Sequence, residues 1–241
     1  MVYSMKTDKG AVRSMNQDNC FMTVFDENSC FAIVCDGMGG PKAGDIASNI
    51  AVKVISEKFV SGWNNKISLN DAKELLVESI NAANVKVYSV AGDNPEYEGM
   101  GTTVVAALCY DNMLLIANVG DSRAYLINDS LKQITKDHSY VQELIDTGKL
   151  TEKEAEDFPY KNIITRALGT NPTVIPDTFF VSLKDNEICL LCSDGLYNYA
   201  SEQEITDLIK SVDIEELATA LVDTANKNGG GDNITALVFS K

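Results

Sequence analysis

The sequence has 241 residues, of which 45% are hydrophobic and 23% are charged, as in an ordinary globular protein that can bury a sizeable core. Lys and Arg number 20 against 35 Asp and Glu, so the formal net charge is −15. A surplus of acid this large repels phosphate backbones and anionic lipids, so we expect neither nucleic acid nor a membrane as a partner.

No stretch is apolar over the length needed to cross a bilayer, and residues 1–9 lack the apolar core of a secretory signal. We therefore expect a cytoplasmic protein. Most of the six cysteines lie in apolar runs, where a free thiol behaves as a small hydrophobic group. Cys189 and Cys192 have the spacing of a zinc motif, but on the strand predicted there they point to opposite faces and cannot share an ion.

A hairpin follows the N-terminal strand in the predicted order of elements. Residues 21–25 and 30–35 are strand-like, with a polar turn between them. The second run is apolar throughout, which predicts a strand buried on both faces. Asp18 precedes the first strand and Asp36 follows the second, so both lie at the same end of the hairpin. Neighbouring strands are about 4.8 Å apart, so the two carboxylates can face one pocket.

The rest of the chain alternates between helical and strand-like patterns. Apolar residues at helical spacing predict helices over 43–59, 71–90, 202–210 and 214–228. Further strands are predicted over 102–110, 113–119, 124–127, 187–192 and 234–239. Residues 128–180 hold only short amphipathic pieces between polar loops. We interpret about 136–180 as a flap insertion in a single domain over 1–241, because this part shows no long apolar face of its own.

Four acidic residues share one pattern, in which glycine lies beside a carboxylate at the end of a predicted strand: Asp36, Asp121, Asp194 and Asp232. An Asp-Gly pair after a strand is often an ordinary turn. Carboxylates that cluster at strand ends without an obvious basic partner, however, repel one another unless cations neutralise them. With one histidine and no suitable cysteine set, oxygen is the available ligand type, which favours Mg²⁺ or Mn²⁺ over Zn²⁺.

Six motifs occur in order over nearly the whole chain: Gly10-x-x-Arg13 with Asn16-x-Asp18, Asp36-Gly-Met-Gly-Gly40, Gly101-Thr-Thr103, Gly120-Asp-Ser-Arg123, Ser193-Asp-Gly195 and Gly231-Asp-Asn233. This set resembles the metal-dependent PPM/PP2C-type serine/threonine protein phosphatases in their compact bacterial form. An ordered series of this extent is far more specific than a lone glycine-rich loop.

The resemblance implies an α+β fold, a four-layer α-β-β-α sandwich with a central pair of antiparallel sheets. It also implies a site for two divalent ions, Mn²⁺ or Mg²⁺. Asp36 would bridge the two ions and the carbonyl of Gly37 would bind one of them. Asp194 and Asp232 would bind the second.

Three roles beyond the two-metal core follow from the same resemblance. Asp18 would hold a metal-associated water, and Asp121 together with Asp194 would form a third, weaker metal site. Arg13 is similar to the arginine that clamps the substrate phosphate in this family. Its guanidinium is a planar fork that fits phosphate oxygens, which lysine does not offer.

The charges predict a mechanism in which no side chain is the nucleophile. Two ions about 3.5–4 Å apart lower the pKa of a bridging water, so that hydroxide exists near neutral pH. That hydroxide would attack phosphorus in line, while Arg13 and the ions stabilise charge on the phosphoryl oxygens. Catalysis would then depend on Arg13, Asp18 and Asp36, and no phosphoenzyme would form.

Two positions depart from patterns found in relatives. Met38 stands where animal members carry a histidine proposed to protonate the leaving group, so a metal-associated water would serve instead. Methionine is common there in bacterial members. Gln17 stands where a glutamate is often found, and this change removes no direct metal ligand.

Several polar residues near the motifs are expected to support the site rather than react. For His138, the single histidine, we expect a structural hydrogen bond in preference to a general-acid role. Asn233 is expected to have at most a minor role. Arg123 and Arg166 are expected to make structural or flap-positioning contacts, and the threonines at 102–103 to pack near the site.

These features predict a phosphatase that hydrolyses phosphoserine and phosphothreonine in proteins and acts as a monomer. The resemblance implies that it opposes a bacterial Ser/Thr kinase and acts on that kinase and its substrates. One alternative is the same chemistry dedicated to a single regulatory phosphoprotein. Another is a catalytically inactive relative that serves as a binding or regulatory module, against which the complete set of core acids argues.

Overall fold

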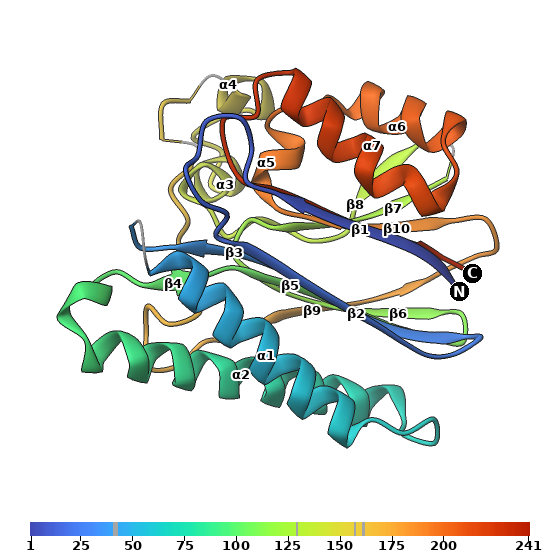
Figure 1. Cartoon of the computed structure of the whole chain (residues 1–241), viewed down its shortest axis with the longest axis horizontal. Coiled ribbons are helices and arrows are strands. Elements are labelled where there is room, and N and C mark those ends of the chain that lie inside the picture. The colour runs from blue at the N-terminus through green and yellow to red at the C-terminus, as the bar shows by residue number, and fades with distance from the viewer. Residues whose placement is uncertain (41–42, 129, 157, 161) are drawn as a thin grey trace.

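Two antiparallel sheets lie face to face at the centre of the molecule, and helices cover the outer face of each (Figure 1). The computed structural model describes residues 1–40, 43–128, 130–156, 158–160 and 162–241. The order of layers is helix, sheet, sheet, helix, which confirms the predicted α+β sandwich.

The strands of the two sheets come from all parts of the chain. The first sheet contains β1 (Val2–Asp8), β7 (Arg123–Ile127), β8 (Leu131–Gln133), β10 (Ile188–Cys192) and β11 (Ile234–Ser240). The second contains β2 (Asp18–Asp26), β3 (Ser29–Met38), β5 (Val104–Tyr110), β6 (Met113–Val119) and β9 (Asp177–Ser182), with the short β4 (Gly101–Thr102) paired to β3. Their spatial orders are β1-β11-β10-β7-β8 and β2-β3-β5-β6-β9.

The helices form the two outer layers. The second sheet is covered by α1 (Gly44–Gly62) and α2 (Leu69–Asp93), and the first by α5 (Asp194–Tyr197), α6 (Glu202–Ser211) and α7 (Ile214–Lys227). The 3₁₀ turn η1 (Pro95–Tyr97) follows α2, and α3 (Tyr140–Asp146) and α4 (Glu152–Glu156) lie between β8 and β9. In the described part of the chain, no helix is both long and apolar enough to cross a membrane.

Strand β3 shows why its sequence is apolar without alternation. Phe31, Ile33 and Cys35 pack under α1 and α2, whereas Cys30 and Val34 point the other way, into the space between the sheets. Each side chain therefore meets an apolar layer whichever face it is on. This confirms the prediction of a strand buried on both faces.

Strand β10 shows the same arrangement on the other sheet. Cys189 lies between the two sheets, and Cys192 packs under the helices of the first sheet. The two thiols therefore point to opposite faces, as predicted. All six cysteines of the chain are free thiols.

The sequence analysis missed two strands, β8 and β9. Each is the last strand of its sheet, and their side chains are largely half-buried or exposed. An edge strand of this kind lacks the continuous apolar run by which the central strands were found. The predicted flap range, 136–180, includes α3, α4 and the start of β9, while residues 157 and 161 lie outside the described part.

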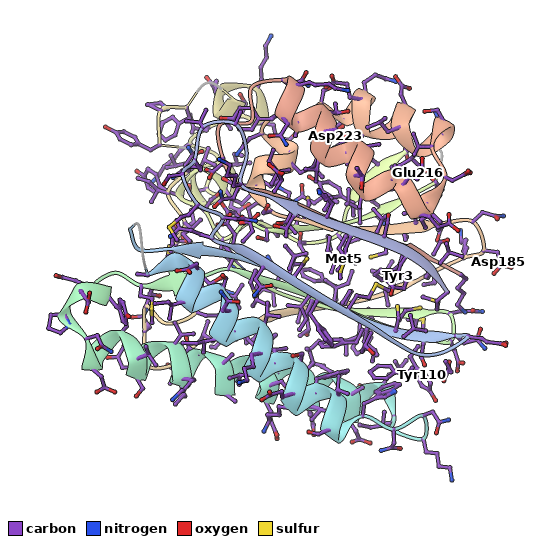
Figure 2. The ribbon with its side chains drawn as sticks, viewed as in Figure 1. Tyr3, Met5, Tyr110, Asp185, Glu216 and Asp223 are labelled. Atoms are coloured by element: carbon purple, nitrogen blue, oxygen red, sulfur yellow. The ribbon has the colours of Figure 1, made fainter. Side chains whose placement is uncertain are left out.

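Aromatic side chains fill the space between α1 and one end of the second sheet. The rings of Phe31 and Phe59 stack with their centroids 4.0 Å apart, and Trp63 meets Tyr110 edge-on at 5.2 Å. Tyr110 lies at the end of β5 next to these helices (Figure 2). Stacked and edge-on pairs of this kind add to the free energy gained from burying the rings.

We expect Phe59→Ala to lower the free energy of unfolding by about 3–5 kcal/mol, because Phe59 is fully buried and its removal leaves a cavity. The neighbouring change Val60→Ala, at a side chain that is 38% exposed, should cost less than about 0.5 kcal/mol. Urea unfolding of both variants measures the difference. Equal losses for the two variants would contradict this packing.

Candidate active site

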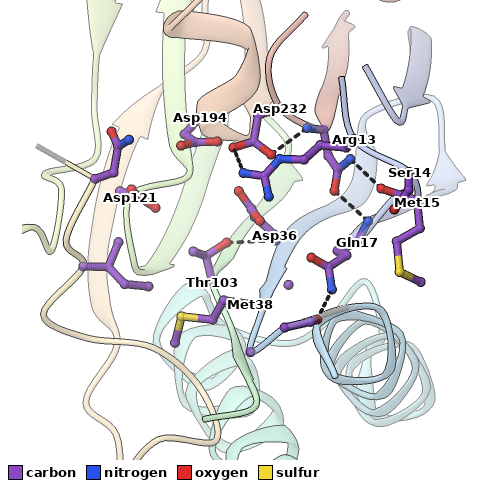
Figure 3. A pocket seen from close by; sticks show the side chains of 16 residues that line it. Arg13, Ser14, Met15, Gln17, Asp36, Met38, Thr103, Asp121, Asp194 and Asp232 are labelled. Atoms are coloured by element: carbon purple, nitrogen blue, oxygen red, sulfur yellow. Dashed lines mark hydrogen bonds and ion pairs between the residues drawn. The ribbon is translucent and has the colours of Figure 1, made fainter. Parts of the chain in front are cut away.

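A pocket of about 460 Å³ lies where several strands of the two sheets begin or end. Its lining brings together seven of the predicted site residues: Arg13, Asp36, Gly37, Asp121, Asp194, Asp232 and Asn233 (Figure 3). They come from the loop after β1, from β3, from the turn after β6, from the start of α5 and from the loop before β11. Residues far apart in the sequence therefore share one site.

Two threonines form hydrogen bonds with the backbone of Asp36. Its N–H donates to Thr103 Oγ1 at 2.9 Å, and its carbonyl accepts from Thr102 Oγ1 at 2.8 Å. Asp36 lies directly opposite Asp18 in the β2–β3 ladder. The sequence analysis placed Asp36 after the strand predicted over 30–35. This is wrong, because the pairing of β3 with β4 extends β3 to Met38.

Gly37 is a glycine because three backbone segments meet there. A Cβ at this position would lie 2.0 Å from the carbonyl oxygen of Gly44 and 2.7 Å from that of Gln17. The Gly37 N–H donates to the same Gln17 oxygen at 3.1 Å, and the Gln17 side chain donates to the carbonyl of Gly40 at 2.8 Å. A larger residue would push the start of α1 away from the strand that carries Asp36.

Asp18 lies beside Asp36 but is not part of the pocket lining. Its carboxylate is buried, and one oxygen, Oδ2, accepts from Ser193 Oγ at 2.6 Å and from Thr235 Oγ1 at 2.7 Å. The other oxygen, Oδ1, is buried and has no hydrogen-bond partner in the described residues. The sequence analysis did not assign Ser193 or Thr235 to Asp18, although Ser193 stands inside one of the motifs.

Burial and the charges of neighbouring carboxylates make it unfavourable for the acids of this cluster to ionise. Burial, followed by the charges of Asp18 and Asp194, holds the pKa of Asp36 well above its usual range. Burial also raises the pKa of Asp18 and of Asp121 to about 7, and that of Asp194 to about 6, where the charge of Asp232 adds to the effect. Positive charge placed among these groups would relieve the repulsion.

Arg13 forms an ion pair with one member of this cluster. Its Nη2 donates to Asp232 Oδ2 at 2.8 Å, and 51% of the Arg13 side chain remains exposed. The expectation that the acids lack a basic partner is therefore wrong for Asp232. Sequence spacing could not reveal this pair, because the two residues meet only when β1 and β11 are neighbours.

Asn233 fastens the loop that carries Arg13. Its Oδ1 accepts from the Gln17 N–H at 2.8 Å, and its Nδ2 donates to the carbonyls of Lys9 and Met15 at 2.9 Å each. Both ends of the amide are thus occupied by the backbone of residues 9–17. These contacts hold the loop in place, and the minor role in the site predicted for Asn233 stays a prediction.

Asp121 lies in the turn between β6 and β7 and is 8% exposed. Its carbonyl accepts from the hydroxyl of Tyr197 at 3.0 Å, and the next residue, Ser122, shares a 2.7 Å hydrogen bond with the hydroxyl of Thr103. Thr103 also accepts from Asp36, so one short chain of bonds joins the two acids. The sequence analysis did not find Tyr197.

Three other residues singled out from the sequence lie outside the pocket lining. His138 is buried next to the Asp121 turn, where its Nδ1 accepts from the Gly120 N–H. Arg123 forms a two-pronged ion pair with Asp137, with nitrogen–oxygen distances from 2.7 to 3.1 Å. Arg166 binds Asp177 at 2.8 Å. Both arginines make the structural contacts predicted for them.

The chemistry of the pocket fits hard cations. Its charged ligand groups are carboxylates, and one buried oxygen of Asp194 has no hydrogen-bond partner in the described residues. Among those residues, no three Asp, Glu, His or Cys side chains are placed to hold a metal ion by themselves. Carbonyl and water oxygens would complete the coordination, as is usual for Mg²⁺, which binds through one or two carboxylates and keeps several waters.

Comparison with known proteins identifies the family. Residues 9–237 match the family model described as protein phosphatase 2C. The chain belongs to this family. It is 41% identical to the serine/threonine phosphatase stp of Listeria welshimeri, over 98% of this chain and 94% of that protein. It is 38% identical to the protein phosphatase PhpP of Streptococcus pneumoniae, over 100% of this chain and 97% of that protein.

Solved structures of serine/threonine phosphatases agree with the fold. Stp1 from Staphylococcus aureus superposes with a TM-score of 0.92 at 38% identity, covering 99% of this chain and 94% of that one. The catalytic domain of the phosphatase PstP, solved with two manganese ions, has a TM-score of 0.85 at 32% identity and covers 98% and 96%.

The protein is therefore a serine/threonine protein phosphatase of compact bacterial form, from a metal-dependent family, and it acts on phosphorylated proteins. These similarities do not favour the alternative of an inactive binding module.

We expect the metal-free phosphatase to lose stability as pH rises from about 4 to 7. The folded-state pKa values of Asp18, Asp121 and Asp194 lie near 6–7, above the ordinary value of 3.8, so the folded state binds more protons than the unfolded state in this window. Urea unfolding in EDTA should show a shallower decline for Asp36→Asn than for wild type, and Mn²⁺ should restore wild-type stability at pH 7.5.

Asp223→Asn is the matched control for this experiment, because Asp223 is exposed on α7 (Figure 2) and is not among the residues that line the pocket. Its decline with pH should equal that of wild type. Identical slopes for Asp36→Asn and Asp223→Asn would mean that the pocket carboxylates do not repel one another.

Proposed function

We propose that this pocket is the catalytic site and that it hydrolyses phosphoserine and phosphothreonine with two divalent cations, Mn²⁺ or Mg²⁺. Asp36, the Gly37 carbonyl, Asp194 and Asp232 would hold them, and Asp121 with Asp194 would hold a third. The observation that carries this proposal is the meeting of these acids, from separate parts of the chain, in one pocket that also contains Arg13.

The cations, when bound, supply a water of lowered pKa and neutralise charge on the phosphoryl oxygens. Asp18 is suited to orient water in the site. Ser193 and Thr235 donate to its Oδ2 and keep that oxygen occupied, which leaves Oδ1 free to accept a hydrogen bond. Because both donors are buried, the carboxylate is held in one orientation before substrate arrives.

Arg13 is placed to bind the phosphoryl group of the substrate. Its guanidinium has five N–H donors, of which Asp232 engages one nitrogen, and the exposed remainder faces the pocket that it lines. Asp232 thereby orients the fork, and Asn233 fixes the loop on which Arg13 stands. The chain thus orients the Arg13 guanidinium and leaves some of its N–H donors free to bind phosphate.

Water, rather than a side chain, is the proposed nucleophile. The lining includes the hydroxyls of Ser14 and Thr103, and that of Thr103 is already bonded to the Asp36 N–H and to Ser122 Oγ, so it is not free to attack phosphorus. Met38, also in the lining, has no proton to give. No phosphorylated enzyme should accumulate.

We further propose a monomeric cytoplasmic enzyme that opposes a bacterial Ser/Thr kinase, has no membrane or nucleic-acid partner, and acts on that kinase and its substrates. The acidic net charge and the six free cysteines support this setting. A phosphoproteome compared with and without the protein tests the pairing. Phosphoserine and phosphothreonine should rise on the kinase substrates when the protein is absent, and a rise at one protein alone would favour the dedicated phosphatase.

Asp36→Asn should abolish Mn²⁺-dependent hydrolysis of a phosphoserine peptide, with kcat/KM reduced by about 10²-fold or more, since a charged ligand and part of the charge stabilisation are lost. Asp185→Asn, at an exposed turn between β9 and β10, should behave as wild type (Figure 2). Activity retained in Asp36→Asn would overturn the proposed site.

Arg13→Lys should lower kcat/KM by about 10–100-fold while leaving Mn²⁺ binding unchanged, because lysine keeps the charge but not the planar fork. Steady-state kinetics on the same phosphopeptide and calorimetric titration with Mn²⁺ separate the two effects. Wild-type kinetics in Arg13→Lys would show that Arg13 does not clamp phosphate.

A further inference from the structure

The side chain of His138 makes two hydrogen bonds, one as an acceptor and one as a donor. Its Nδ1 accepts from the Gly120 N–H at 3.0 Å, and its Nε2 lies 3.1 Å from Asp177 Oδ2. Since a backbone N–H can only donate, Nδ1 must carry a lone pair, and the ring proton is on Nε2, facing Asp177. Burial lowers the pKa of His138, which keeps the ring in this neutral form.

The Gly120 N–H belongs to the turn that carries Asp121. Gly120 has a φ of +108°, in the left-handed region that favours glycine, so the turn has a backbone conformation that other residues rarely adopt. The Nδ1 of His138 accepts from the N–H of Gly120, the first residue of the turn, and the backbone N–H of His138 donates to the Gly120 carbonyl at 3.0 Å. Tyr197 holds its other side by donating to the Asp121 carbonyl at 3.0 Å.

The same histidine, which itself lies in the predicted flap range, connects this turn to residues 164–166. The His138 carbonyl accepts from the Thr165 N–H at 2.8 Å, and Ser139 pairs with Ile164 as an isolated antiparallel bridge. Asp177, which accepts the hydrogen bond from Nε2, also binds Arg166 at 2.8 Å. A displacement of the 164–166 segment would therefore reach the Gly120 N–H through one ring.

We propose that His138 is a positioning residue that, together with Tyr197, fixes the Gly120–Asp121 turn and thereby sets the affinity of the cation site formed by Asp121 and Asp194. This inference rests on the proposed function. His138 does not line the pocket, so it acts through the backbone of the turn and exchanges no proton with substrate.

Two substitutions separate the two bonds of the ring. His138→Asn places an amide oxygen where Nδ1 stands, so it keeps an acceptor for the Gly120 N–H and loses the contact with Asp177. His138→Gln places its terminal amide nitrogen near the position of Nε2, so it keeps the donor to Asp177 and loses the acceptor for Gly120. Each variant is therefore the control for the other.

Calorimetric titration of the full-length protein with Mn²⁺ provides a readout besides activity. We expect His138→Gln to weaken the weakest class of Mn²⁺ sites by about 10–100-fold, as is usual when a group that supports a ligand is lost. His138→Asn should stay within about 3-fold of wild type, and both variants should bind Mn²⁺ at the stronger sites as wild type does. The pH profile of kcat should keep its shape in His138→Asn.

Asp121→Asn is the reference variant that shows how the weakest class of Mn²⁺ sites responds when one of its proposed ligands is lost. If Asp121→Asn weakens this class and His138→Gln does not, or if His138→Asn and His138→Gln weaken it equally, the inference is overturned. If Asp121→Asn leaves all Mn²⁺ binding unchanged, the third site and the inference fall together. The two-cation proposal would then still stand or fall on Asp36→Asn alone.

Tyr197→Phe provides a second variant should either histidine change prevent folding, as judged by circular dichroism. It removes only the hydroxyl that donates to the Asp121 carbonyl. We expect it to weaken the same class of Mn²⁺ sites by about 10-fold while the stronger sites are unchanged. Unchanged binding at every site would show that the anchors of the turn do not control Asp121.

Discussion

The burial of several carboxylates close to one another is the constraint on which the site depends. Asp18, Asp36, Asp121 and Asp194 all have a raised pKa, and burial is the first cause in each case. A cluster of this kind destabilises the folded protein unless protons or cations neutralise it. The same unfavourable energy favours positive charge in the pocket, so part of the stability of the fold would be exchanged for affinity toward the proposed cations.

The scaffold tolerates these buried carboxylates because each acid is held by groups that do not depend on its charge alone. Threonines bond to the backbone of Asp36, and two buried hydroxyls bond to one oxygen of Asp18. Around them lie three apolar layers, one between the sheets and one under each pair of long helices. The packed sheets fix where the acids stand, and ion binding then needs little rearrangement.

The acids fall into two groups that differ in how they are connected to the rest of the chain. Asp36 lies within β3, which pairs with β2 on one side and with β4 and β5 on the other. Asp121 stands on a turn whose backbone is held by the side chains of His138 and Tyr197. The turn is joined through His138 to residues 164–166, so the proposed third cation site is the one that can respond to the predicted flap. This difference gives a structural reason for expecting that site to be the weaker one.

The sequence by itself determined the central strands, the long helices and the set of acids, because apolar spacing and acid–glycine pairs are local signals. It failed at the edge strands β8 and β9, whose side chains are half-exposed, and it ended β3 before Asp36 instead of after it. Only the tertiary structure decided that Arg13 pairs with Asp232, that Ser193 and Thr235 hold Asp18, and which nitrogen of His138 carries the proton. These hydrogen bonds join residues far apart in the chain, so their existence depends on strand order and register, which no local pattern encodes.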